Sequence, residues 1–201
     1  MGSYAFAAQY QQTPAPIGGG IIKTAWFRYY DHAPRYQQND RIYQSWDTAS
    51  KDGELNDYSV CTTWLKRGPD IYLLDVAKDK FEYPALRRAA ITQYRKYASI
   101  FRLVIEDKGS GTGLIQDLKQ EGIYAKAFRP ETDKVTRMAN ETPAIEGGNV
   151  YLPKRALWLD DYLQELSRFP NGKHDDQVDS TSQALNVMTK GKVLVPRIRS
   201  L

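Results

Sequence analysis

The sequence predicts an α/β domain with a mixed sheet of five strands flanked by helices. Two observations lead to this fold class. Three strand-like segments follow one another between residues 41 and 77 with short connections, as in an antiparallel meander. From residue 83 onward, helix-like and strand-like segments alternate, which is typical of a sheet covered by helices.

The three meander strands are rich in β-branched and aromatic residues, which favour extended structure. The first covers residues 41–49 (RIYQSWDTA) and the second covers residues 58–65 (YSVCTTWL). The turn signal Gly68-Pro69-Asp70 separates the second strand from the third, residues 71–77 (IYLLDVA). We expect these strands to pair in antiparallel fashion.

The rest of the chain predicts two further strands and several helices. Apolar residues spaced as on one helix face run from 83 to 99, and the compact apolar run 101–105 (FRLVI) predicts a buried strand. The remaining expected elements are a loop over 109–113, a helix over 114–121, a strand over 124–128, a helix over 134–146 despite Pro143, an extended piece over 150–152, and helices over 158–169 and 175–188.

We predict that residues 1–37 form an arm and that residues 38–201 form the folded domain. The arm contains several glutamines and prolines and the run Gly18-Gly19-Gly20, which interrupt any periodic pattern. Hydrophobic residues make up 41% of the chain and charged residues 26%, as in globular proteins with a real core.

The composition argues against several classes of protein. The single cysteine, Cys61, allows neither an internal disulfide nor a zinc site built on cysteines. No apolar run approaches the roughly 20 residues of a membrane span, and the N-terminus lacks the pattern of a signal peptide. We therefore expect a cytoplasmic protein that is not secreted and has no membrane partner. The net charge of +4 favours an anionic partner only weakly.

Acidic residues that suggest chemistry occur at three places. Asp47 lies inside a predicted strand, where aspartate is unfavourable. Glu106 ends the buried strand, where side chains emerge at the end of an α/β sheet. Asp175, Asp176 and Asp179 open the last helix, and positions three or four apart share a helix face. If the two strands are neighbours and this helix packs over them, the carboxylates converge.

Converging carboxylates repel one another unless cations compensate their charge. Oxygen ligands select Mg²⁺ or Mn²⁺ over zinc. Two such ions, about 3.5–4 Å apart, can activate a water and stabilise the leaving oxygen of a phosphodiester. The acidic residues are therefore consistent with two-metal phosphodiester hydrolysis.

Each acidic group also has an ordinary structural explanation. Asp47 can be a strand-end residue, and Glu106-Asp107 can be an acid pair in a loop. Asp175 and Asp176 can be an N-cap and a first-turn acid, which the helix dipole favours.

The acidic positions belong to a set of motifs that resembles the nuclease domain of the large terminase subunit of tailed phages, in the ribonuclease H-like superfamily. The resemblance extends from about residue 41 to residue 190, in the family's order. Its motifs are QSWDTA (44–49), DYSV (57–60), YLLDV (72–76), IEDKGSG (105–111), Asp133-Lys134 with Arg137, VYLP (150–153) and HDDQVDS (174–180).

The resemblance implies a ribonuclease H-like fold and two-metal cutting of double-stranded DNA. Asp47 would bridge two Mg²⁺ or Mn²⁺ ions, and Glu106 would be the second acidic ligand. The third would be Asp176 with Asp179 close by, but the family varies here, so the choice among these two and Asp175 stays open. The basic residues expected to contact the DNA backbone are Lys51, Lys108, Lys134 and Arg137.

The family also implies partners, namely a terminase small subunit and a portal, in the cytoplasm of a bacterial host. Residues 6–14 (FAAQYQQTP) resemble the segment that links the family's ATPase domain to its nuclease. The ATPase motifs are missing here, since the glycine-rich segment 109–113 lacks the Lys-Ser/Thr pair of a Walker A motif. Two alternatives stay open: another ribonuclease H-like enzyme, such as a resolvase or transposase catalytic core, and a non-catalytic DNA-binding packaging module.

Overall fold

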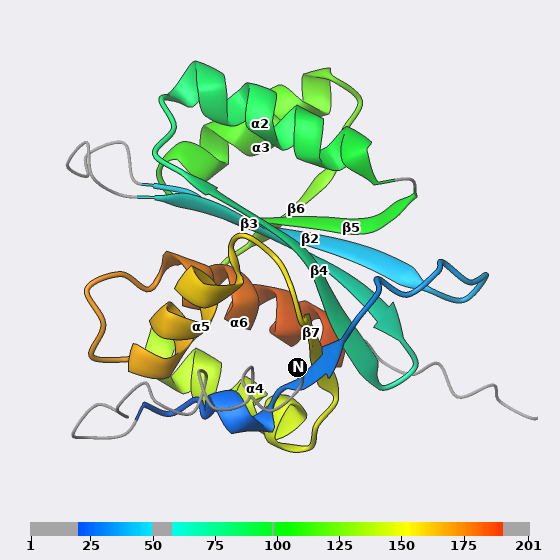
Figure 1. Ribbon diagram of the computed structural model, residues 1–201. Helices are drawn as coiled ribbons and strands as arrows, with labels where there is room; N and C mark the ends of the chain where they lie inside the picture. The colour runs from blue at the N-terminus through cyan, green and yellow to red at the C-terminus, as the bar shows by residue number, and fades with distance from the viewer. Residues whose placement is uncertain (1–19, 50–57, 98, 191–201) are drawn as a thin grey trace, which may run out of the picture.

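The computed structural model describes residues 20–49, 58–97 and 99–190, which form three layers (Figure 1). A mixed sheet of seven strands lies between two layers of α-helices. The strands are β1 (Arg28–Tyr30), β2 (Arg41–Asp47), β3 (Ser59–Arg67), β4 (Asp70–Asp79), β5 (Ile100–Glu106), β6 (Ala125–Phe128) and β7 (Val150–Pro153).

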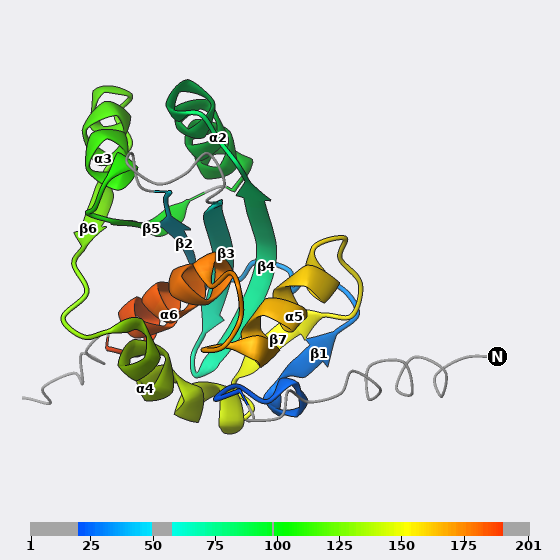
Figure 2. The ribbon, with the colours of Figure 1, turned by 90° about the vertical axis from the view of Figure 1, so that its left-hand side faces the viewer.

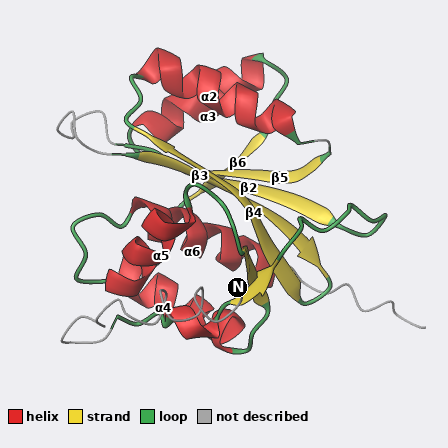
Figure 3. Cartoon of the chain, viewed as in Figure 1, coloured by secondary structure: helices red, strands yellow, loops and turns green. Residues whose placement is uncertain are grey.

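The α-helices divide between the two faces of the sheet (Figure 3). α2 and α3 cover one face, and α4, α5 and α6 cover the other (Figure 1, Figure 2). No helix in the described residues is long and apolar enough to span a lipid bilayer. The helices are the short 3-10 helix η1 (Thr24–Trp26), α2 (Tyr83–Lys96), α3 (Ser110–Gln120), α4 (Lys134–Glu146), α5 (Leu159–Arg168) and α6 (Asp176–Thr189).

The sheet runs in the order β1-β7-β4-β3-β2-β5-β6. β2, β3 and β4 form the expected antiparallel meander. β5 pairs in parallel with β2, and β6 pairs in parallel with β5. The strand that carries Asp47 is therefore the neighbour of the strand that carries Glu106, which is the condition for their carboxylates to converge.

The α/β class with a mixed sheet and flanking helices is confirmed, but the sheet has seven strands where the sequence predicts five. β7 pairs with β4, and β1 pairs with β7, both in parallel. The sequence predicts only an extended piece at β7 and nothing at β1. Both strands are too short for their residues to show a periodic pattern.

Part of the predicted arm packs on the core. Ile22 and Phe27 are buried, with 2% and 5% of their surface exposed. The backbone N–H of Ile21 donates to the carbonyl of Phe169, just after α5, at 3.2 Å. Residues 20–30 therefore share the core beneath α5, while residues 1–19 lie outside the described residues. The domain boundary at residue 37 stays a prediction.

β2 and β5 are covered on both faces, so their alternate side chains enter two separate cores. Trp46 packs with Leu114 of α3 in the core under α2 and α3. Tyr43 and Val104 pack in the other core, which includes Leu185 of α6. By the same alternation, Asp47 and Glu106 lie on the face that α6 covers.

The glycine-rich segment after β5 is helical, and the loop predicted over 109–113 is wrong. α3 begins at Ser110, so Gly111 and Gly113 lie in its first turn. A Cβ at Gly111 would lie 2.0 Å from the carbonyl oxygen of Glu106. Glycine at position 111 therefore lets α3 begin directly against the end of β5. Glu106, one of the candidate site residues, is the last residue of that strand.

Replacing Gly111 by alanine should destabilise the fold by about 1–3 kcal/mol, because backbone atoms must move to relieve the clash. Gly113→Ala is the matched control, since its Cβ would meet only the end of the Tyr83 side chain, at 3.0 Å. We expect that variant to stay within about 1 kcal/mol of the wild type, because alanine also favours the helix. Urea unfolding of the two variants measures both values. Equal stability of the two variants would contradict the close approach.

Candidate metal centre

Asp47 and Glu106 end neighbouring parallel strands at the same end of the sheet. The last register pair between β2 and β5 joins Trp46 to Ile105. Each acid is the next residue of its strand, so the two side chains lie side by side on the face that α6 covers. Asp47 is thus the last residue of a central strand, and its position is set by pairing on both sides.

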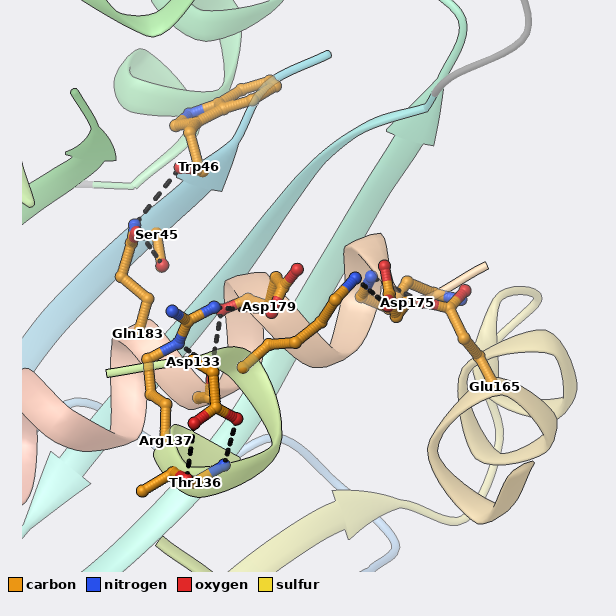
Figure 4. Close-up of polar contacts among 12 residues, drawn as sticks. Ser45, Trp46, Asp133, Thr136, Arg137, Glu165, Asp175, Asp179 and Gln183 are labelled. Carbon is orange, nitrogen blue, oxygen red and sulfur yellow. Dashed lines mark hydrogen bonds and ion pairs between the residues drawn. The ribbon is translucent and has the colours of Figure 1, made fainter. Parts of the chain in front are cut away.

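α6 is tied to this part of β2 by buried hydrogen bonds. The Ser180 hydroxyl donates to the carbonyl of Ser45 at 2.8 Å. Gln183 Nε2 donates to Ser45 Oγ at 2.9 Å and to the carbonyl of Trp46 at 3.2 Å (Figure 4). One helical turn before Gln183, Asp179 shares its face of the helix. The bonds therefore direct Asp179 toward the end of β2.

The pKa of Asp47 shows which charged groups lie near its carboxyl group. The protein packed around the carboxyl group removes water and raises the pKa of Asp47 well above its ordinary range. The negative charges of Asp179, Glu106 and Asp176, in that order, raise this pKa further. β2, β5 and α6 therefore bring these carboxylates near one another, and their role as metal ligands stays a prediction.

The acids of α6 share this unfavourable environment. Burial raises the pKa of Asp176 to about 6, with contributions from Glu165 and Asp175. Burial also raises the pKa of Asp179 to about 6, even though Arg137 and Lys134 oppose the shift. A carboxyl group whose charged form is disfavoured in this way is stabilised as a carboxylate when a cation binds beside it.

Two of the basic residues predicted at DNA are engaged with these acids. Arg137 of α4 is buried, and it donates to Asp179 Oδ1 at 2.6 Å and to Ser182 Oγ at 2.9 Å. Lys134, at the start of α4, forms an ion pair with Asp175 (Figure 4). Asp175 lies at the N-cap position of α6, but its side chain makes no capping hydrogen bond. Both cations therefore act as counterions of the cluster.

The other predicted site residues separate in the structure. Lys108 is exposed just after β5, and Lys51 lies outside the described residues. Asp107 belongs to a different network from Glu106, because its carboxylate accepts from Arg129 at 2.8 Å and from Thr112 at 2.8 Å. The Arg129 guanidinium and the Thr112 hydroxyl lower the pKa of Asp107. Asp107 fixes the turn after Glu106 and stays outside the cluster.

Sequence reasoning missed Glu165 of α5, which holds the first turn of α6. Its carboxylate accepts from the backbone N–H and from the side chain of Gln177, both at 2.6 Å. Lys78 of β4 donates to the same carboxylate at 2.9 Å. An acid on the apolar stripe of a predicted helix, three residues after Tyr162, was the available signal.

The chemistry of the cluster fits a hard divalent cation. The candidate donors are all carboxylate oxygens, and the raised pKa values of Asp47, Asp176 and Asp179 show that the charged forms of these three are disfavoured where they lie. As the side chains stand, no group of three or more His, Cys, Asp or Glu residues in the described chain is arranged to hold a metal ion. Two of the acids, Asp175 and Asp179, instead form ion pairs with Lys134 and Arg137.

Comparison with known proteins places the fold. Residues 44–187 match a family described as the terminase RNaseH-like domain. The large terminase nuclease of thermophilic phage G20c with bound magnesium is similar at a TM-score of 0.65 and 15% identity, over 85% of this chain and 98% of that chain. The large terminase of another thermophilic bacteriophage, in complex with ADP, is similar at a TM-score of 0.67 and 14% identity, over 86% of this chain and 46% of that chain.

The G20c nuclease with bound zinc is also similar, at a TM-score of 0.62 and 19% identity, over 81% of this chain and 94% of that chain. No curated protein matches. The three-layer arrangement and these likenesses define a ribonuclease H-like domain. Because the family match covers most of the chain, the chain belongs to the terminase RNaseH-like domain family. It spans less than half the length of the ADP-bound phage terminase.

The metal-free protein should lose stability as pH rises from about 4 to about 7. The folded-state pKa values of Asp176 and Asp179 are about 6, above the ordinary value near 4. The folded protein therefore binds more protons than the unfolded chain in this window, and stability falls as they are released. Asp176→Asn should recover about 1 kcal/mol near pH 7 after allowance for solvent screening, or roughly 2–4 °C in Tm.

Chemical unfolding in EDTA at a series of pH values measures this slope. Asp117→Asn serves as the control, because Asp117 lies on α3, on the far face of the sheet, and bonds to Tyr83. A pH slope that is the same in Asp176→Asn and in the wild type would contradict the raised pKa of Asp176.

Proposed function

We propose that this chain is a metal-dependent endonuclease that cuts double-stranded DNA during viral genome packaging. The observation that carries the proposal is the convergence of Asp47, Glu106 and Asp179 from β2, β5 and α6, in a terminase RNaseH-like domain. Solved structures of the similar G20c nuclease contain bound magnesium, zinc or cobalt. Among biological cations, the all-oxygen donor set here favours Mg²⁺ or Mn²⁺.

Two bound ions would supply an activated water and charge stabilisation of the leaving oxygen of the phosphodiester. Asp47 would hold the metal at the centre of the cluster, because Glu106 and the α6 acids lie near it. We assign Glu106 to one side of Asp47. On the other side we favour Asp179 over Asp176 as the main third ligand, because Asp179 acts most strongly on Asp47. Asp175, held by Lys134, takes an outer position.

Arg137 and Lys134 neutralise Asp179 and Asp175. When cations take over that neutralisation, the half-exposed Lys134 ammonium becomes available for a DNA phosphate beside the cluster. The buried Arg137 guanidinium keeps its hydrogen bond to Ser182 and stays a counterion of the acids. Phosphate contacts position a duplex without reading its sequence, so recognition of a packaging site would require a partner.

That partner would be a terminase small subunit, and an ATPase domain and a portal would complete the motor in the bacterial cytoplasm. This part of the proposal rests on family membership and on the length of the ADP-bound phage terminase, of which this chain spans 46%. A non-catalytic DNA-binding module is the second candidate, and one observation favours it. The ion pairs of Arg137 and Lys134 would suit a cluster that never binds metal.

Plasmid cleavage by the purified chain tests the proposal. We expect cutting with Mn²⁺ or Mg²⁺, none with EDTA, and a loss of at least about 100-fold in Asp47→Asn and Glu106→Gln, because a ligand of the reacting centre is removed. Asp179→Asn should lose more activity than Asp175→Asn. The comparison of Asp179→Asn with Asp175→Asn tests the assignment of the third ligand.

Asp117→Asn should cut like the wild type, because it removes a carboxylate on the opposite face of the sheet. A duplex and a four-way junction compared as substrates separate a packaging nuclease from a resolvase-type enzyme. Duplex binding without cutting in any metal would favour the non-catalytic module.

A further inference from the structure

A second feature of the α6 face is a pocket of about 360 Å³ beside the carboxylate cluster. It lies between the β5–β6 edge of the sheet and the helices α4 and α6. Its lining contains five basic residues and one acid, and that acid is Glu131. The basic residues are Arg102, Lys126, Arg129, Arg137 and Lys190.

The pocket adjoins the candidate metal centre through one residue. Arg137 lines the pocket and also donates to Asp179. Arg102 lies on the same strand and the same face as Glu106, with Val104 between them in the α6-side core. Four residues of strand span about 13 Å.

Most of these cations are not neutralised by the protein. Arg129 pairs with Asp107, and Arg137 pairs with Asp179. Arg102, Lys126 and Lys190 form no ion pair with any carboxylate among the described residues, although Arg102 lies near the ring of Phe101. A concave surface with several uncompensated cations attracts an anion.

We propose that this pocket binds backbone phosphates of a DNA strand beside the bond that is cut. The proposal rests on the proposed function and names Arg102, Lys126 and Lys190 as a phosphate track that leads to the carboxylate cluster. The three cations come from β5, β6 and the end of α6, so they are spread along a surface. Such spacing suits successive phosphates of a polymer better than a single small anion.

The salt dependence of DNA binding tests this track without any cutting. A labelled duplex is titrated with protein in EDTA at several salt concentrations, for the wild type and for Arg102→Gln/Lys126→Gln. Each lost phosphate contact should lower the slope of log K against log salt by about 0.9, so the double variant should lose about 1.8. Lys126→Gln alone, at an exposed position, should lose about 0.9 if the buried part of Arg102 makes the double variant unstable.

Arg88→Gln/Lys119→Gln is the matched control. It removes the same charge from exposed positions on α2 and α3, which cover the opposite face of the sheet. A slope equal to the wild type in the pocket variants, or an equal loss in the control, would overturn the proposal. Loss of inorganic phosphate binding with an unchanged duplex slope would also overturn it, and would assign the pocket to a small anion.

This test separates the inference from the proposed function. A reduced slope in a protein that never cuts DNA would support the track and reject the nuclease. Metal-dependent cutting with an unchanged slope would support the nuclease and reject the phosphate track.

Discussion

The structure depends on holding like charges together at the end of one strand. Asp47 ends a strand that is paired on both sides, so its backbone is held beside the end of β5, which carries Glu106. The acids of α6 are brought to the same place because Gln183 ties that helix to β2. Burial, together with the charges of neighbouring acids, raises the pKa of Asp47 and of Asp179. Bringing these carboxylates together costs stability unless a cation compensates their charge. This cost is understandable if the function of the cluster is to bind a cation.

The surrounding residues compensate this repulsion. Arg137 of α4 lies buried and pairs with Asp179 of α6. Glu165 adds another negative charge, yet it is neutralised by Lys78 and bonded to the first turn of α6 through Gln177. These contacts hold the helix start in place while leaving Glu106 at the free end of β5. Hydrogen bonds and ion pairs therefore fix the start of α6, and two of its acids face basic residues of α4.

Much of the fold and of the cluster could be predicted from the sequence, because the relevant signals are local. An aspartate inside a β-branched strand and an acid directly after a buried apolar run both pointed to Asp47 and Glu106. Features that depend on tertiary contact could not be predicted. β1 has only three residues, too few to show a periodic pattern. Gly111 was expected in a loop, because the need for glycine at this helical position comes from the nearby Glu106 carbonyl, which the sequence does not reveal. Arg137 was expected to contact the DNA backbone, but it forms an ion pair with Asp179. This pair joins two helices that are distant in the sequence, so no local pattern predicts it.

The most direct test of the carboxylate cluster as a metal centre is titration of the purified chain with Mn²⁺, with the free ion followed by electron paramagnetic resonance. We expect the wild type and Asp117→Asn to bind the ion, and Asp47→Asn and Glu106→Gln to bind it much more weakly. Binding that is equally strong in Asp47→Asn and in the wild type would contradict a metal centre built on the end of β2.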